Sequence, residues 1–194
     1  VMKKIVAFIL LVCSLYTHGF GQIPLSEKMT QTAIEKLFKD SVFVNNSKGP
    51  KWTYDMGVVL EGVAETWKNT GNSSYFSYIE SWMDKFVGQD GTIKNYSAKD
   101  FNIDHIKNGR TLLLLYKVTK KEKYLKACHT LYKQLLNHPR TKEGGYWHKK
   151  IYPNQMWLDG LYMAQPFRAE YAALMNLTDE YNDIANQFFW MEKN

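Results

Sequence analysis

An acidic residue among aromatic side chains is the feature of this 194-residue sequence best suited to chemistry. Asp159 lies between Leu158 and Gly160, two residues after Trp157 and four before Met163. An acid beside aromatic and apolar groups is desolvated, which favours its protonated form and suits it to act as a general acid. Aromatic rings and a small residue nearby also suit a sugar-binding pocket. The alternative is that Asp159 only caps the helix that follows it, as Asp often does.

Asp104 is a second candidate carboxylate, at the start of another predicted helix in the segment Asn102-Ile103-Asp104-His105. Its position alone favours an N-cap, with Lys107 and Arg110 as neighbours one turn further along. From the residues alone, capping is therefore the simpler interpretation of Asp104.

A glycine-led loop supplies a candidate for ligand binding. His148 follows Trp147 in this loop, and loop residues of this kind contact ligands more often than they fill a core. Four further side chains offer a positive charge or a flat or apolar surface to a sugar, and packing in the core is the alternative for the aromatic ones: Lys149, Tyr54, Trp157 and Met163. The histidines at 105, 129, 138 and 148 form no close ligand pair in the sequence, so we expect no metal and no cofactor.

The elements that must position these residues are predicted to be helices throughout. Apolar residues recur at helical spacing, and no run of strict alternation indicates a strand. A pattern also repeats at about fifty residues: Trp67 to Gly71 leads to Tyr75, Tyr116 to Lys120 leads to Tyr124, and Leu174 leads more loosely to Tyr181. Each copy predicts a hairpin of two helices, and stacked hairpins form either an open solenoid or a closed ring.

Composition and charge indicate one globular domain, or part of one. The sequence is 45% hydrophobic and 15% aromatic, which is enough to build a core. The net charge of +6 suits an anionic substrate, although a solvated basic surface explains it equally well. The lysines are scattered and form no basic stripe, so the sequence does not predict a nucleic-acid partner.

The first 21 residues have the pattern of a secretory signal peptide. Lys3 and Lys4 precede an apolar run from Ile5 to Leu15, which is too short to span a bilayer comfortably. We therefore expect residues 1–21 to be removed, residues 22–194 to form the domain, and the mature protein to be secreted or periplasmic without a membrane attachment. That protein keeps Cys128, which we expect to be buried and not catalytic.

Four separated segments resemble glycoside hydrolase family 105, the unsaturated rhamnogalacturonyl hydrolases. They are WTYDMGVVLEGVAETW, NIDHIKNGRTLLLLY, HPRTKEGGYWHKK and QMWLDGLYMAQPF, which lie in this order between Trp52 and Phe167. The resemblance implies an all-α fold, an (α/α)6 toroid of six hairpins, of which this sequence holds about half. An apolar segment, Phe188 to Asn194, ends the sequence without a stop signal, so we expect a truncated and inactive amino-terminal half.

The resemblance also implies site residues and a reaction. Asp159 matches the principal acid of the family, Asp104 matches the aspartate opposite it in the pocket, and His148 matches a histidine that faces the unsaturated sugar. The implied substrate is a pectin-derived rhamnogalacturonan oligosaccharide with a 4,5-unsaturated uronic acid at its non-reducing end, and the enzyme hydrates the vinyl ether double bond. Two alternatives stay open: an unsaturated glucuronyl hydrolase acting on glycosaminoglycan fragments, and a non-catalytic helical-repeat binding module.

Overall fold

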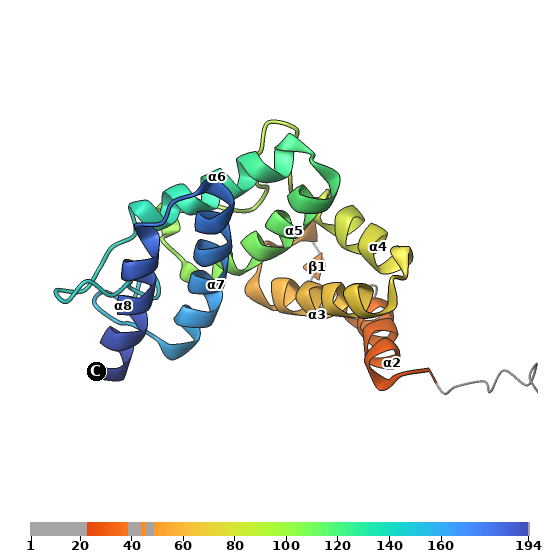
Figure 1. Ribbon diagram of the computed structural model, residues 1–194, viewed down its shortest axis with the longest axis horizontal. Coiled ribbons are helices and arrows are strands. Elements are labelled where there is room, and N and C mark those ends of the chain that lie inside the picture. The colour runs from red at the N-terminus through yellow and green to blue at the C-terminus, as the bar shows by residue number, and fades with distance from the viewer. Residues whose placement is uncertain (1–22, 39–43, 46–48, 194) are drawn as a thin grey trace, which may run out of the picture.

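The computed structural model describes residues 23–38, 44–45 and 49–193, and within these ranges the predicted all-α fold is confirmed (Figure 1). The predicted signal peptide lies outside the described residues and stays a prediction. The helices are α2 (Leu25–Thr32), η1 (Ala33–Phe38), α3 (Tyr54–Thr70), α4 (Ser73–Met83), η2 (Ala98–Asp100), η3 (Ile103–Asn108), α5 (Gly109–Thr119), α6 (Glu122–Leu136), α7 (Leu158–Met175) and α8 (Glu180–Lys193). Two short strands, β1 (Val44–Asn45) and β2 (Gly49–Pro50), pair in antiparallel fashion.

The three predicted hairpins are α3–α4, α5–α6 and α7–α8, and their turns share one geometry. The first helix of each hairpin ends at a residue in the left-handed conformation: Gly71 (φ 69°), Lys120 (φ 58°) and Asn176 (φ 56°). The backbone N–H of each of these residues donates to a carbonyl four residues earlier, which satisfies a group that the helix end leaves open. Asn72 then caps α4 by accepting a hydrogen bond from Ser74 N at 3.0 Å, as its residue type predicts.

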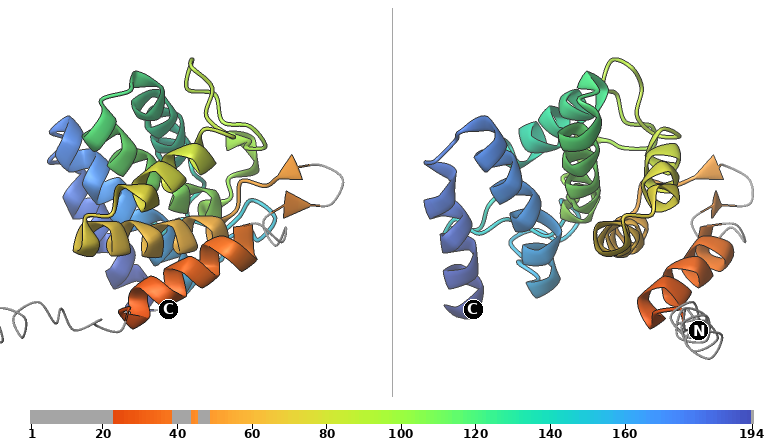
Figure 2. Two further views of the ribbon diagram at one scale, coloured as in Figure 1. Left: turned by 90° about the vertical axis from the view of Figure 1, so that its right-hand side faces the viewer. Right: turned by 45° about the vertical axis from the view of Figure 1, so that its right-hand side comes forward.

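The hairpins follow one another along an arc, which Figure 2 shows from two sides. Helix α5 contacts both α3 and α7, so the first helices of the three hairpins form an inner row. Large apolar side chains fill the space within and between the hairpins, among them Met56, Leu60, Leu112 and Phe167, each fully buried. Cys128 is also fully buried, as predicted. Among the described helices, none has the length and apolar character needed to cross a bilayer.

Two long connections link one hairpin to the next, and they carry much of the polar chemistry. Residues 84–108 join α4 to α5 and include η2 and η3, and residues 137–157 join α6 to α7. Isolated antiparallel bridges, Val87 with Ile93 and Arg140 with Tyr146, fold each connection back on itself. The last residues of the two connections therefore lie at the N-terminal ends of α5 and α7, two helices of the inner row.

Candidate active site

Asp104 is not the N-cap that its position suggested. Asn102 caps η3 instead, because its Oδ1 accepts a hydrogen bond from Asp104 N at 3.0 Å. Lys107 and Arg110, the expected neighbours of Asp104, are paired with Glu61 of α3. The carboxylate of Asp104 is thereby free of a capping role, although it is only 6% exposed.

Two basic side chains of the 137–157 connection reach this buried carboxylate. Lys149 Nζ lies 2.7 Å from Asp104 Oδ2, and His148 Nε2 lies 3.3 Å from Asp104 Oδ1. Burial by itself would raise the pKa of Asp104, but the contacts with His148 and Lys149 outweigh it and lower this pKa below its ordinary value. Asp104 is therefore held as a carboxylate.

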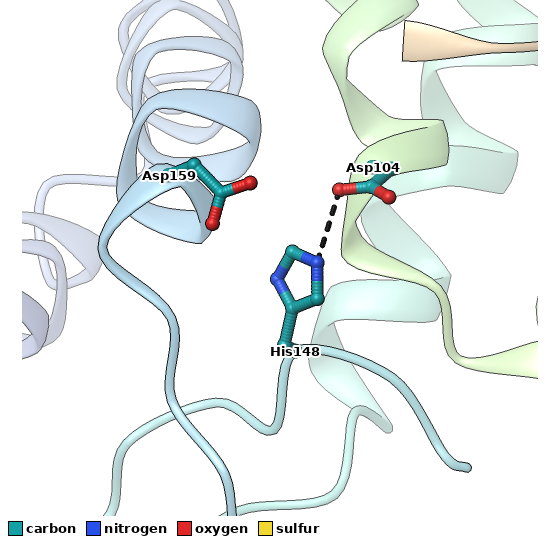
Figure 3. Close-up of side chains that lie close together, drawn as sticks. All are labelled: Asp104, His148 and Asp159. Atoms are coloured by element: carbon teal, nitrogen blue, oxygen red, sulfur yellow. Dashed lines mark ion pairs between the residues drawn. The ribbon is translucent and has the colours of Figure 1, made fainter. Parts of the chain in front are cut away.

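His148 is fixed by its neighbours on several sides. It is 1% exposed, its backbone N–H donates to Gln155 O at 2.7 Å, and its ring stacks on Trp157 with centroids 4.3 Å apart and planes 7° apart. A Cβ at Gly160 would lie 3.1 Å from His148 Nδ1, so the absence of a side chain there lets the imidazole approach α7. Figure 3 shows the ring on the side of Asp104 that faces Asp159.

Asp159 completes the cluster from the first turn of α7, where Trp157 and not Asp159 occupies the N-cap. Asp104, His148 and Asp159 each place one ligand atom within 4.8 Å of the others. Asp159 is nevertheless exposed, so the desolvation predicted from its aromatic neighbours is not found in the described structure. The reason is that Trp157 stacks on His148 and Tyr152, and Met163 is buried in the core.

The other predicted binding residues divide between the site and the core. Lys149 is at the site, and Tyr54, the first residue of α3, is 45% exposed. Trp157 is 39% exposed, and its ring already stacks with two rings of the protein, whereas Met163 is 6% exposed and packs in the core. The structure therefore removes Met163 from the residues that a sugar can reach directly.

The cavity beside His148 is too small for a sugar ring. The cavity that His148 and Trp157 line with Ile103 and Gly160 has a volume of about 10 Å³, which is room for one water molecule. A ligand the size of a sugar ring does not fit in this cavity, whereas Asp159 is exposed to solvent.

A buried chain of hydrogen bonds, which no sequence pattern indicated, ties the two connections together. Gln134 of α6 donates through Nε2 to Asn102 O at 3.0 Å and lies 3.5 Å from His138 Nδ1, while its Oε1 accepts from Tyr96 at 2.7 Å. His138 Nε2 donates to Trp147 O at 2.7 Å. Burial lowers the pKa of His138 to about 4, which keeps its ring neutral as these contacts require. Gln134 and His138 thus position the segments before both Asp104 and His148.

A second polar cluster lies among the inner-row helices, outside the predicted site. Glu61 pairs with Lys107 and Arg110, Arg110 Nε also lies 2.8 Å from Glu170, and the hydroxyl of Tyr162 donates to Glu61 at 3.2 Å. A groove of about 240 Å³ runs between Arg110 and Glu170. These charges satisfy one another, so Arg110 is not free to bind a uronate. Arg168 is likewise engaged, because it is 4% exposed and pairs with Glu180 and Asp183 of α8.

Stacked αα-hairpins with two carboxylates and an imidazole at the ends of the inner row are the arrangement that the family resemblance implied for a glycoside hydrolase. The chain belongs to Glycosyl Hydrolase Family 88, whose family model matches residues 25–194. The resemblance predicted from the four sequence segments is confirmed.

Relatives agree with this assignment. The chain is 28% identical over 174 residues to the unsaturated rhamnogalacturonyl hydrolase YesR of Bacillus subtilis (strain 168), covering 87% of this chain and 47% of that protein. It is 41% identical, with a TM-score of 0.77, to a glycoside hydrolase of family 105 from C. acetobutylicum ATCC 824, covering 86% of this chain and 45% of the other.

A more distant structure shows the same fold. A possible family 105 member from Salmonella enterica subsp. enterica serovar Paratyphi A has a TM-score of 0.68 at 22% identity, covering 93% of this chain and 51% of the other. The chain thus spans about half the length of the relatives that it matches.

Proposed function

We propose that the protein removes a 4,5-unsaturated uronic acid from the non-reducing end of pectin-derived rhamnogalacturonan oligosaccharides. One observation carries this proposal: η3, the 137–157 connection and α7 bring ligand atoms of Asp104, His148 and Asp159 within 4.8 Å of one another. The activity of YesR, which its name states, supports the choice of substrate.

The environments of the two carboxylates support different roles. Asp104 is buried, its pKa is lowered, and it forms an ion pair with Lys149, so it stays ionised and orients the substrate. Asp159 is exposed to solvent and serves as the proton donor. A sugar ring that covers Asp159 supplies the desolvation that the described chain does not provide by itself.

The reaction proceeds by hydration of the double bond. Asp159 delivers its proton to C4, which leaves positive charge at C5 shared with the ring oxygen. As a carboxylate, Asp159 then takes a proton from the water whose oxygen bonds to C5. The resulting hemiketal opens, and its rearrangement breaks the bond between C1 and the oxygen of the next sugar. Because C1 is not attacked, the rule that relates carboxylate separation to retention or inversion does not apply.

Because we expect the 194-residue chain to be inactive by itself, the assay uses a protein that contains this chain and has the full length of its relatives. The assay follows the ultraviolet absorbance of an unsaturated rhamnogalacturonan disaccharide, which disappears on hydration. We expect Asp159→Asn to lower turnover by about two to four orders of magnitude, since loss of a general acid costs that much. Asp104→Asn should be similarly severe, whereas Asp179→Asn, an exposed acid outside the cluster, should match the parent protein. Retained turnover in Asp159→Asn would remove that residue from its role.

A parallel assay with an unsaturated chondroitin disaccharide tests the sugar specificity. Faster turnover of the chondroitin substrate would favour a glucuronyl hydrolase over the proposed activity. Binding without turnover of either disaccharide would favour a helical-repeat binding module.

We also propose that the protein is secreted or periplasmic, on the strength of the charged and apolar pattern of residues 1–21. Fractionation of cells that express the chain tests this location. Recovery of the unprocessed chain from the cytoplasm alone would contradict it.

A further inference from the structure

The cluster of Asp104, His148 and Asp159 has a property that vinyl ether hydration does not use. Asp104 Oδ1 is buried without a hydrogen-bond partner, although His148 Nε2 lies 3.3 Å away. The contact has the distance of an ion pair but not the directional geometry of a hydrogen bond. A buried carboxylate oxygen with no donor is costly, and it is available to another electrophilic partner.

The distances suit a transition-metal ion. In a tetrahedral zinc site with bonds of about 2.0 Å, neighbouring ligand atoms are separated by about 3.3 Å. His148 Nε2 and Asp104 Oδ1 have this separation. A third ligand atom, from Asp159, lies within 4.8 Å of both, and the exposed carboxylate of Asp159 can rotate to shorten that distance.

The ligand types select the metal. One imidazole and two carboxylates suit zinc, whereas magnesium and calcium prefer sites built from oxygen alone. Three protein ligands leave a fourth position open to solvent on the side where Asp159 is exposed. The spacing of the histidines predicted no metal because no two of them are close in the sequence, whereas the fold joins one histidine to two aspartates.

We propose that Asp104, His148 and Asp159 form a zinc-binding site that coincides with the candidate active site, and that Zn²⁺ bound there blocks it. The metal occupies the oxygen of Asp159 that would otherwise carry the catalytic proton. The blocking effect rests on the proposed function, whereas the binding site does not.

Two features limit the affinity. Lys149 places a positive charge 2.7 Å from the other oxygen of Asp104, and it opposes a second cation. The proton of a zinc-bound His148 would sit on Nδ1, which is buried without a partner next to Gly160. We therefore expect a dissociation constant in the micromolar range, typical of inhibition and not of a structural metal.

Isothermal titration calorimetry of the untagged protein with zinc chloride tests the site directly. We expect one site per chain, and a loss of affinity of roughly tenfold or more in His148→Gln and in Asp159→Asn. Asp159 is exposed, so Asp159→Asn should fold even if His148→Gln does not. Asp179→Asn is the matched control and should bind as the parent protein does. Unchanged affinity in Asp159→Asn, or no saturable binding in the parent protein, would overturn the proposal.

Lys149→Gln gives a result in the opposite direction. Removing this ammonium group should tighten zinc binding several-fold, because it takes away repulsion at the site. Weaker or unchanged binding would contradict the assigned ligands, since a zinc ion elsewhere on the surface would not respond in this way.

Inhibition separates the two proposals. If zinc binds and also slows turnover of the unsaturated disaccharide in competition with substrate, both proposals are supported. If zinc binds with the expected variant pattern to the full-length protein, and that protein turns over no unsaturated disaccharide, the metal site stands and the proposed function fails. If turnover proceeds unaffected by saturating zinc, the blocking role is overturned.

Discussion

His148 depends on a glycine for its position. The stack with Trp157 holds one face of the imidazole, and Gly160 lets its edge approach the first turn of α7. A methyl group at residue 160 would meet His148 Nδ1 at 3.1 Å and Ile103 Cγ2 at 3.4 Å. The contact with His148 is tight enough that the ring would have to shift by a few tenths of an ångström.

Gly160→Ala should therefore lower the proposed activity of the full-length protein without lowering stability. Alanine gains about 1 kcal/mol over glycine inside a helix, which offsets the tight contact. The turnover of unsaturated disaccharide should fall, while the urea midpoint of unfolding stays level or rises. The control is Gly62→Ala on α3, where a Cβ meets nothing within 4 Å, so stability should rise and turnover should not change. Equal turnover in the two variants would contradict this account of His148.

The sequence predicted which three side chains lie together better than it predicted their surroundings. Asp104, His148 and Asp159 could be named because their residue types and family segments are local information. The burial of Met163 and the stacking of Trp157 on His148 depend on how α7 packs against η3 and the 137–157 connection, which no local pattern specifies. For the same reason, the exposure of Asp159 could not be anticipated from its neighbours in sequence.

At the level of elements, α6 is the anchor for both connections that carry the site. Gln134 lies in the last turn of α6 and His138 lies two residues after α6 ends, and they hold the backbone carbonyls of Asn102 and Trp147. The hairpins themselves were predictable because their turns repeat, whereas this anchor was not. A buried glutamine and histidine have no sequence signature that separates them from surface residues.

The neutral ring of His138 predicts how stability depends on pH. Its pKa is about 4 in the folded protein because of burial, against 6.5 for an ordinary histidine, so the unfolded chain takes up a proton first as pH falls. Stability should therefore decrease between pH 6.5 and about 4, by up to about 3 kcal/mol. Urea unfolding at several pH values measures this slope.

His138→Gln provides the comparison, because glutamine can still donate to Trp147 O but does not titrate. The slope between pH 6.5 and 5 should become shallower in this variant. Part of the pH dependence of stability should remain in this variant, because burial also lowers the pKa of His105. An unchanged slope of stability against pH would show that His138 does not cause the loss of stability at low pH.

The whole molecule presents apolar side chains at its two outer helices. Phe188 and Phe189 of α8 are 49% and 56% exposed, and Leu25 and Met29 of α2 are more exposed still. Adjacent exposed aromatic residues favour self-association.

We expect the 194-residue chain to form concentration-dependent oligomers, which multi-angle light scattering after size-exclusion chromatography detects. Replacing both Phe188 and Phe189 with Ser should reduce the oligomers. Val118→Ser removes a single exposed side chain of α5 and should have little effect. A monodisperse parent protein over a wide concentration range would contradict the prediction.

The three hairpin turns offer a route to a more heat-resistant protein. The three turns can be compared position by position. The residue after the first helix of each hairpin is a glycine, a lysine or an asparagine, and all three have the same left-handed conformation. Lysine is the residue least suited to it, since its Cβ is strained there, whereas glycine has no such strain. Copying the first turn into the second with Lys120→Gly should therefore add about 1 kcal/mol and raise the melting temperature by a few degrees in calorimetry. The site residues lie in the connections and in the first turn of α7, and not in these hairpin turns, so thermal tolerance could be improved while the chemistry is left alone.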